Sequence, residues 1–246
     1  MKKFIFVAGC ARSGTGALAQ LLSASDDIVM GMERFGHLES KGSFSLTPEH
    51  FEKERFFDVR DGDTFYGNFD EFHRHDRKIR EKFDSCIYIG DKRPELYECY
   101  DEIFQIFRDA VVFFIYRNIR EVASSYQGRV TERNNWPADK NFRAAVMEWN
   151  RSLFLTREAI RKGYNIKCVD YESVFLSHDR LDVIFSTLGL LLDAGEWDRV
   201  NAVIARSEQL SKERVSLLSA DEEDFVAENA KEFLVRDIEK SNILRL

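Results

Sequence analysis

The sequence is poor in the residues that mark linkers, membrane spans and metal sites. It has only three prolines and no tract rich in serine and glycine, so we expect no long linker. No segment approaches the ~20 consecutive apolar residues that span a bilayer. The four cysteines have no spacing typical of metal ligands, which predicts buried, reduced thiols and no metal; they are Cys10, Cys86, Cys99 and Cys168.

Excess positive charge is also missing. Asp and Glu number 43 against 36 Lys and Arg, a net charge of −7, so no nucleic-acid-binding surface is expected. A few arginines and lysines brought together by the fold can still form a local basic pocket. The apolar stretch after Met1 is shorter than the ~7–15 residues of a secretory signal and has no clear cleavage segment, so we interpret it as a strand. We therefore expect a cytoplasmic protein.

The residues that are present predict one α/β domain over residues 1–246. Hydrophobic residues make up 44% of the chain, including 21 Phe, which is enough for a sizeable core. Short apolar runs alternate with helical patterns, which predicts a three-layer α/β/α fold with a mostly parallel central sheet. The expected strands are 4–8, 28–32, 86–90, 110–116 and 166–171; the expected helices are 17–22, 76–83, 95–108, 119–126, 142–160 and 181–192.

Two regions fall outside this alternation. Residues 34–75 contain four glycines, many aromatics and four of the five histidines, and we expect loops and short helices there that lie over the site and recognise the substrate. Residues 193–246 are charged and helical without another clear strand. The sequence leaves the oligomeric state open.

The first expected strand runs into a glycine-bounded turn, Gly9-Cys-Ala-Arg-Ser-Gly-Thr-Gly16, and a helix follows. Such a strand–turn–helix points backbone N–H groups and the positive end of the helix dipole at one spot, which favours an anion, most often a phosphate. The spacing resembles a P-loop. Where a nucleotide triphosphatase has Lys and then Ser or Thr, however, this chain has Thr15 and Gly16, and its only cation in the turn is Arg12.

Further polar residues stand at other strand ends. Arg117 follows the most apolar run, and Ser125 comes eight residues later on the next helix, so both can reach one phosphate. Two anion sites at separate strand ends imply a ligand with phosphates at two separated points. Glu33, the stretch Gly90-Asp-Lys-Arg-Pro94 and the stretch Asp170-Tyr-Glu172 also follow expected strands.

These stretches together resemble sulfotransferases that use 3′-phosphoadenosine 5′-phosphosulfate (PAPS). The turn is similar to the family's 5′-phosphosulfate loop, and Tyr116-Arg-Asn-Ile-Arg-Glu-Val-Ala-Ser-Ser125 is similar to its 3′-phosphate segment. Gly90-Asp-Lys-Arg-Pro94 is similar to the Gly-(Glu/Asp)-Lys-x-Pro element of many bacterial members. Val169-Asp-Tyr-Glu-Ser-Val174 with Leu188-Gly-Leu190 resembles a later family pattern. The resemblance covers about residues 3–192 with its motifs in the family's order.

The resemblance implies a role for each matching residue. PAPS would be the co-substrate, and no metal would be required. Arg12, Ser13, Gly14, Thr15 and Gly16 would hold the 5′-phosphosulfate. Arg117 and Ser125 would hold the 3′-phosphate, and Lys92 would approach the transferred sulfuryl group. The catalytic set would be Arg12, Lys92 and a base.

Two departures from the family pattern qualify these roles. Gly16 replaces a hydroxyl residue, so one contact to the donor is lost. The histidine that serves as base in cytosolic members is replaced by Pro94. We choose Glu33 as the base because it ends the second strand, with His37 as the alternative; Glu33 can equally pair with a nearby cation such as Arg34.

The sequence therefore predicts transfer of a sulfuryl group to a hydroxyl or amine acceptor. A carbohydrate, a lipid or a small hydroxyl metabolite all remain open as the acceptor. Two other functions stay open: a P-loop kinase or nucleotide hydrolase, and a PAPS-binding protein without catalytic activity.

Overall fold

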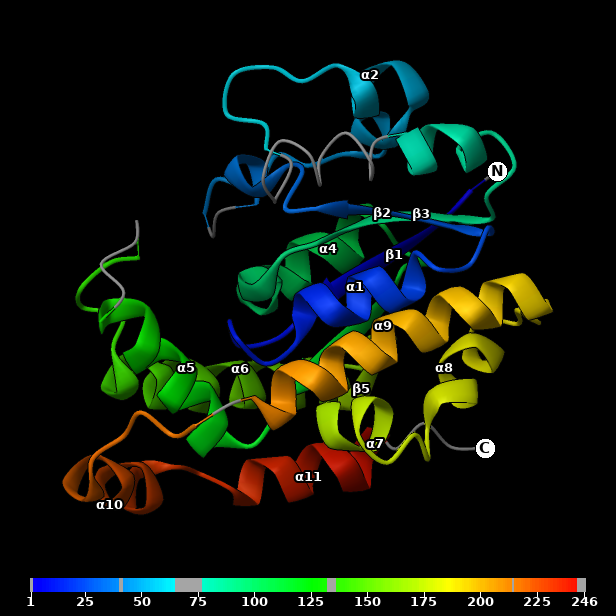
Figure 1. Cartoon of the computed structure of the whole chain (residues 1–246). Coiled ribbons are helices and arrows are strands. Elements are labelled where there is room, and N and C mark those ends of the chain that lie inside the picture. The colour runs from blue at the N-terminus through cyan, green and yellow to red at the C-terminus, as the bar shows by residue number, and fades with distance from the viewer. Residues whose placement is uncertain (1, 40–41, 65–76, 132–135, 214, 243–246) are drawn as a thin grey trace.

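The centre of the molecule is a parallel sheet (Figure 1). The computed structural model describes residues 2–39, 42–64, 77–131, 136–213 and 215–242. Within these ranges the strand order is β2-β3-β1-β4-β5, and every neighbouring pair is parallel. The strands are β1 (Lys3–Ala8), β2 (Ile28–Met32), β3 (Tyr88–Lys92), β4 (Val111–Tyr116) and β5 (Ile166–Asp170).

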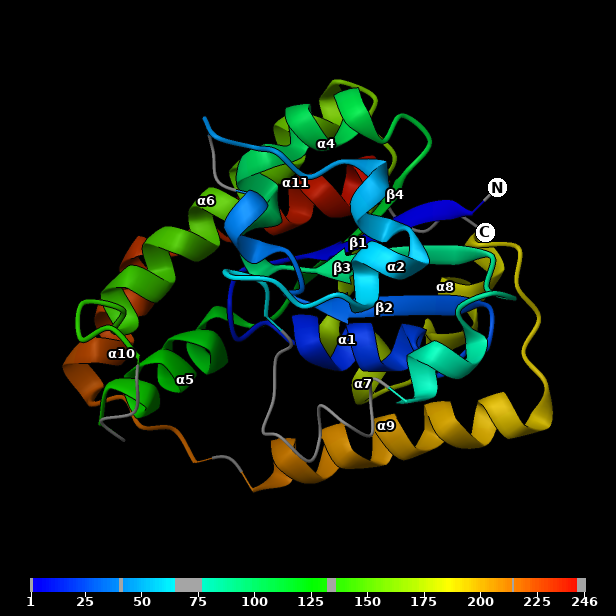
Figure 2. The ribbon, with the colours of Figure 1, turned by 90° about the horizontal axis from the view of Figure 1, so that it is seen from above.

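Helices cover both faces of this sheet (Figure 2). One layer contains α4 (Tyr100–Ile106), α5 (Ile119–Thr131), α6 (Phe142–Arg161) and α11 (Phe233–Asn242); the other contains α1 (Thr15–Leu22), α7 (Tyr171–Phe175), α8 (Leu181–Thr187) and α9 (Ala194–Lys212). Strand β1 supplies both cores, because Phe6 and Ala8 point to the first layer while Ile5 and Val7 point to the second. The predicted α/β/α fold with a parallel sheet is confirmed.

The third strand is displaced from its expected position. It was expected at 86–90, whereas β3 runs from Tyr88 to Lys92 and so includes two charged residues. Gly90 lies in this strand where β3 passes close to β1. A Cβ there would lie 1.5 Å from the carbonyl oxygen of Ile5, so the position requires glycine. Asp91 is tolerated in the sheet because backbone N–H groups surround its carboxylate, a tertiary contact that the apolar pattern does not contain.

Several helix bounds also differ from the expected ones. The helix expected over 95–108 is a 3₁₀ helix, η3 (Pro94–Cys99), followed by α4. The helix expected over 181–192 ends at Thr187, because Gly189 adopts a φ of +72° that stops the helix. Helix α5 extends past 126 to Thr131, and α7 was not expected at all.

The two irregular regions contain short and long helices respectively. Between 34 and 64 lie η1 (Gly36–Leu38), η2 (Pro48–Phe51) and α2 (Lys53–Phe57), whereas 40–41 and 65–75 lie outside the described residues. Residues 77–82 are helical, inside the span expected for a helix. After residue 193 come α9, α10 (Ala220–Asn229) and α11, and α9 begins at a capping box formed by Asp193 and Glu196.

Candidate active site

The loop between β1 and α1 owes its shape to two glycines. A Cβ on Gly9 would lie 2.3 Å from the carbonyl oxygen of Ile115 in β4. Gly14 has a φ of +100°, and a Cβ there would lie 2.5 Å from the ring of Tyr171. Because both substitutions would displace backbone or a buried ring, the loop backbone is fixed against β4 and α7.

Ser13 and Gly16 of this loop have different surroundings. Ser13 is fully buried, and its Oγ has no hydrogen-bond partner in the part of the chain that the structure describes. A buried hydroxyl of this kind is costly unless something binds it, so Ser13 suits a loop that receives an anion. At Gly16, in contrast, an added Cβ would meet nothing within 4 Å, so neither space nor backbone conformation requires glycine there.

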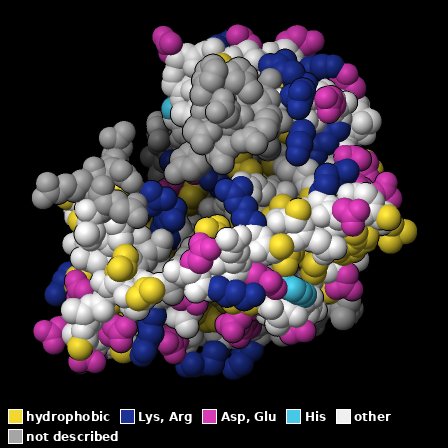
Figure 3. Space-filling view, viewed as in Figure 1, with side chains coloured by type: hydrophobic (Ala, Val, Ile, Leu, Met, Phe, Trp, Pro, Cys, Tyr) yellow, Lys and Arg dark blue, Asp and Glu magenta, His cyan; other side chains and the backbone are white. Residues whose placement is uncertain are grey.

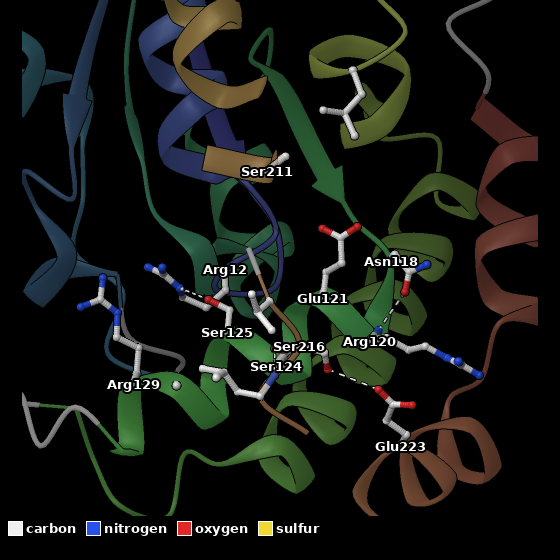
Figure 4. Close-up of a pocket in the computed structure, with 14 residues that line it drawn as sticks. Arg12, Asn118, Arg120, Glu121, Ser124, Ser125, Arg129, Ser211, Ser216 and Glu223 are labelled. Atoms are coloured by element: carbon white, nitrogen blue, oxygen red, sulfur yellow. Dashed lines mark hydrogen bonds between the residues drawn. The ribbon is translucent and has the colours of Figure 1, made fainter. Parts of the chain in front are cut away.

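Arg12 connects this loop to the second predicted anion site. Its Nε donates a hydrogen bond to Ser125 Oγ on α5 at 3.0 Å (Figure 4). Residues 113 positions apart therefore meet, because β1 and β4 are neighbours and both strands end at the same edge of the sheet. The structure thus brings together Arg12 and Ser125, which the sequence predicted at separate sites.

Arg117 lies directly after β4 and is almost wholly buried. Its guanidinium carbon lies 4.0 Å from the centre of the Tyr171 ring, and its Nη2 is ion-paired with Glu121 one helical turn further on α5. The same nitrogen lies 3.5 Å from Ser211 Oγ at the end of α9. Trp149 donates its indole N–H to the Arg117 carbonyl at 3.0 Å, which holds the backbone. The Arg117 guanidinium is therefore held in place, with the Glu121 carboxylate as its ion-pair partner.

A pocket of about 650 Å³ opens beside these groups. Figure 3 shows a hollow between the surfaces formed by α5 and α9, with Lys and Arg side chains at its margin. Arginine and serine side chains from three separate segments line the pocket, among them Arg12, Arg120, Ser125, Arg129 and Ser216. Aliphatic Leu176, Val215 and Leu217 complete the wall. This volume lies within the range of small-molecule sites, ~300–1,000 Å³.

Ser211 and residues 215–217 form a wall of this pocket that the sequence did not predict. They leave the end of α9 and reach α5, where the Leu217 N–H donates to Ser124 Oγ at 2.9 Å. The side chain of Leu217 also lies over Gly128, where an added Cβ would come within 2.7 Å of it. Nothing in the local pattern of this segment indicates the contact. Only the long path of α9 across the sheet produces it.

Lys92 and Glu33 form an ion pair at the neighbouring strand ends. Lys92 Nζ donates to Glu33 Oε1 at 2.5 Å; the lysine side chain is 4% exposed and the glutamate side chain 27%. Glu33 immediately follows β2 and has a φ of +59°, an uncommon conformation for a residue other than glycine. Its N–H donates to the Lys92 carbonyl at 2.8 Å, which extends the β2–β3 pairing by one residue.

Asp91 precedes Lys92 in β3 and is buried. Its Oδ1 accepts from the Lys92 N–H at 2.8 Å, and its Oδ2 accepts from the Phe35 N–H at 3.1 Å. Burial raises the pKa of Asp91 to about 6, against the opposing effect of hydrogen bonds from the N–H groups of Arg34, Phe35 and Lys92. A Cβ on Gly31 would lie 2.6 Å from Asp91 Oδ1, so the glycine of β2 leaves the space that the carboxylate occupies.

Arg34 anchors the segment after β2. It is wholly buried; its Nη1 pairs with Asp63 at 2.8 Å, and its Nε donates to the Phe56 carbonyl at 3.0 Å. Burial disfavours ionised Asp63, but hydrogen bonds from Arg55, the Arg60 N–H and Arg34 outweigh burial and hold its pKa below the ordinary range. Arg34 thus pairs with Asp63, and this pair fastens the segment 53–64 to the end of β2.

The alternative base, His37, lies in η1, where its Nε2 is 3.8 Å from Asp63 Oδ1 and its side chain is 35% exposed.

All four cysteines are free and buried, and burial is the main reason that the pKa of each thiol is raised. Within the described ranges, no three His, Cys, Asp or Glu side chains are grouped so as to hold a metal ion. No helix among these residues has the length and apolar character needed to cross a membrane.

Solved structures with a similar fold are sulfotransferases. The sulfotransferase STF9 from Mycobacterium avium matches with a TM-score of 0.56 at 11% identity, over 100% of this chain and 78% of that one. STF1 from Mycobacterium tuberculosis H37Rv matches with a TM-score of 0.49 at 17% identity, over 82% of this chain and 71% of that one. The sulfotransferase domain of the Synechococcus PCC 7002 olefin synthase gives 0.49 at 16% identity, over 93% and 95%.

Comparison of the sequence with protein-family models identifies the family of this chain. No curated protein sequence matches the chain. The model of the sulfotransferase family, in contrast, matches residues 5–179, which is more than half of the chain and includes both predicted phosphate sites and the Lys92–Glu33 pair. With its glycine-bounded loop, its second basic strand end and its parallel sheet, this chain belongs to the sulfotransferase family.

Proposed function

We propose that the pocket beside Arg12 and Arg117 binds PAPS and that the chain transfers the sulfuryl group to a hydroxyl or amine. The observation that carries this proposal is the hydrogen bond between Arg12 and Ser125, since it joins the anion-binding loop to the second basic strand end. The donor has phosphate-type groups at two separated points, and the chain has one basic site for each. A solved mouse sulfotransferase, SULT7A1, is described in complex with 3′-phosphoadenosine 5′-phosphate (PAP), the desulfated donor.

The loop residues would hold the 5′-phosphosulfate. Backbone N–H groups at the start of α1, from Gly14 to Gly16, have no partner within the helix and point toward the loop mouth, where the helix dipole adds to their attraction for an anion. The Ser13 hydroxyl and the Arg12 guanidinium would complete the site. Arg117 and Ser125 would hold the 3′-phosphate, and Glu121 would have to give up its place on Arg117 when that phosphate binds.

Lys92 and Glu33 would carry out the transfer. As the bond between sulfur and the bridging phosphate oxygen breaks, negative charge grows on that oxygen, and the buried Lys92 ammonium would stabilise it. A new bond forms between sulfur and the acceptor oxygen or nitrogen, whose proton passes to the Glu33 carboxylate. The Lys92 ammonium and the Glu33 carboxylate hold each other in place through their ion pair. No step in this route calls for a metal ion.

The acceptor would enter on the side of β2 and β3. The segment 53–64 is fastened there by the buried Arg34–Asp63 pair, and its Thr64 bonds to the backbone of Glu33 and Arg34. We propose that this segment contacts the acceptor, which belongs to one of the three predicted classes: carbohydrate, lipid or small hydroxyl metabolite. Because all four thiols are buried and free of disulfides, we also propose a reducing, cytoplasmic location.

Nothing in the structure or the comparisons favours the P-loop kinase alternative. A kinase or hydrolase needs a loop lysine for the β- and γ-phosphates, whereas this chain has Thr15 at that position. Thermal unfolding with added nucleotide separates the two functions. We expect PAP to raise the melting temperature and ATP with Mg²⁺ to have little effect; the reverse order would overturn the proposal.

Turnover separates an enzyme from a protein that only binds the donor. The measurement is transfer of ³⁵S from labelled PAPS to a panel of sugars, lipid headgroups and small phenols and alcohols. We expect transfer to at least one class. Stabilisation by PAP without any transfer would leave the chain as a binding protein and would contradict the catalytic roles of Lys92 and Glu33.

A further inference from the structure

The turn that presents Glu33 has an unusual support. Glu33 has a left-handed backbone conformation that costs ~1–3 kcal/mol and persists only where its surroundings enforce it. One group that restrains this turn lies on the neighbouring strand: Asp91 accepts hydrogen bonds from Phe35, two residues past Glu33, and from Lys92. One buried carboxylate therefore contacts the backbone on both sides of the Lys92–Glu33 pair.

We propose that Asp91 is a positioning residue of the transfer reaction, and this inference rests on the proposed roles of Lys92 and Glu33. The Asp91 carboxylate fixes the backbone from which Glu33 projects relative to the strand end from which Lys92 projects. It thereby holds the Glu33 oxygen at 2.5 Å from the lysine ammonium. Asp91 accepts from the Phe35 and Lys92 N–H groups, so it acts through the backbone and positions the two reacting side chains.

The chemistry of the site explains why a carboxylate stands there. Three N–H groups, from Arg34, Phe35 and Lys92, converge on Asp91. An ionised carboxylate accepts at both oxygens, whereas an asparagine amide accepts at one oxygen and turns an NH₂ group toward the remaining N–H donors. Hydrogen bonds to a charged acceptor are also stronger than those to a neutral one.

Two surrounding features are consistent with this role. Gly31 on β2 leaves the space for the carboxylate, since a Cβ there would lie 2.6 Å from Oδ1 and 3.0 Å from the Cβ of Arg34. On the other side of the turn, Thr64 donates its hydroxyl to the Glu33 carbonyl and its N–H to the Arg34 carbonyl. The turn is therefore held from the sheet by Asp91 and from the segment 53–64 by Thr64.

The test compares Asp91→Asn with the wild-type chain and with Asp193→Asn. Asp193 also accepts a backbone N–H, at 2.8 Å from Glu196, but it caps α9 away from the Lys92–Glu33 pair. For each chain we would measure the Kd for PAP by calorimetry, and the kcat and KM for PAPS in the ³⁵S transfer assay, normalised to the fraction that binds PAP. If no acceptor in the panel is sulfated, slow release of ³⁵S-sulfate to water replaces transfer.

We expect Asp91→Asn to lower kcat at least tenfold while the Kd for PAP and the KM for PAPS stay within about twofold. Asp193→Asn should leave all three values unchanged. A purely structural role would reduce the PAP-binding fraction and leave the normalised kcat unchanged, and that result would overturn the proposal. Absence of PAP binding by the wild-type chain would instead contradict the proposed function.

Amide hydrogen exchange of the wild-type chain provides a second measure that does not depend on the variant's folding. We expect the N–H groups of Arg34, Phe35 and Lys92 to exchange slowly, as groups bonded to a buried carboxylate do. Fast exchange at Arg34 and Phe35 would show that Asp91 does not hold the turn, and the inference would then fail.

Discussion

Arg117 gives the sharpest test of the donor site. In Arg117→Ala the guanidinium that faces the expected 3′-phosphate is lost, together with its stacking on Tyr171 and its pairing with Glu121. Hydrogen bonds between charged partners contribute ~1.5–3 kcal/mol. At ~1.4 kcal/mol for each factor of ten, the affinity for PAP should fall about 10- to 150-fold.

Glu121 modifies this expectation in a way that can be measured. Its carboxylate is ion-paired with Arg117, so a 3′-phosphate at the proposed site would have to displace it. Glu121→Gln should therefore bind PAP more tightly than the wild-type chain. In Arg117→Ala the same carboxylate has lost its partner and repels the phosphate, so adding Glu121→Gln should restore part of the lost affinity.

Calorimetry with PAP and with AMP, at one fixed salt concentration, checks these values. AMP lacks the 3′-phosphate, so its affinity should change less than about threefold in every variant. Arg151→Ala is the matched control, because it removes the same charge from an exposed ion pair with Glu98 on the outer side of α6. If Arg117→Ala weakens AMP and PAP equally, Arg117 does not contact the 3′-phosphate.

Three further predictions concern the base, the loop and the thiols. Glu33→Gln should keep the Kd for PAP and lower kcat at least tenfold, in the range of general-base effects; full turnover in the transfer assay would exclude Glu33. Gly14→Ala should lower the melting temperature by several degrees, because its Cβ meets the Tyr171 ring at a φ of +100°, whereas Gly16→Ala should match or exceed the wild-type value. Equal melting temperatures would refute this account of the loop. The four thiols, whose pKa values burial raises, should resist iodoacetamide at pH 8 in the folded chain and react within minutes after unfolding, as mass spectrometry can show; rapid labelling of the folded chain would contradict their burial.

The site residues that the sequence predicted are those that directly follow a strand or lie on the helix after it. An apolar run, a glycine-bounded turn and an alanine- and leucine-rich helix indicate β1, the loop and α1, since each signal is local. Arg117 and Ser125 were predictable for the same reason, because one strand and the following helix carry both. The predicted placement of Glu33 directly after β2 is confirmed.

The remaining part depends on contacts between distant segments. Asp91 is a strand residue only because N–H groups from another strand's turn bind its carboxylate, and a charged residue in a local pattern indicates a loop. The wall formed by Ser211 and residues 215–217 depends on the path of α9 back to α5, which no local signal specifies. The meeting of Arg12 with Ser125 likewise required the order of the strands.

That strand order has a consequence for how such a protein diversifies. The residues proposed to bind the donor follow β1 and β4, which are hydrogen-bonded neighbours, so the ~4.8 Å spacing of a rigid sheet would set the separation of the two proposed phosphate sites. Lys92 ends β3 and Glu33 follows β2, and both of these strands lie on the opposite side of β1 from β4. Residues after β2 and β3 can therefore change to accept a new acceptor, while the proposed donor site after β1 and β4 keeps its spacing.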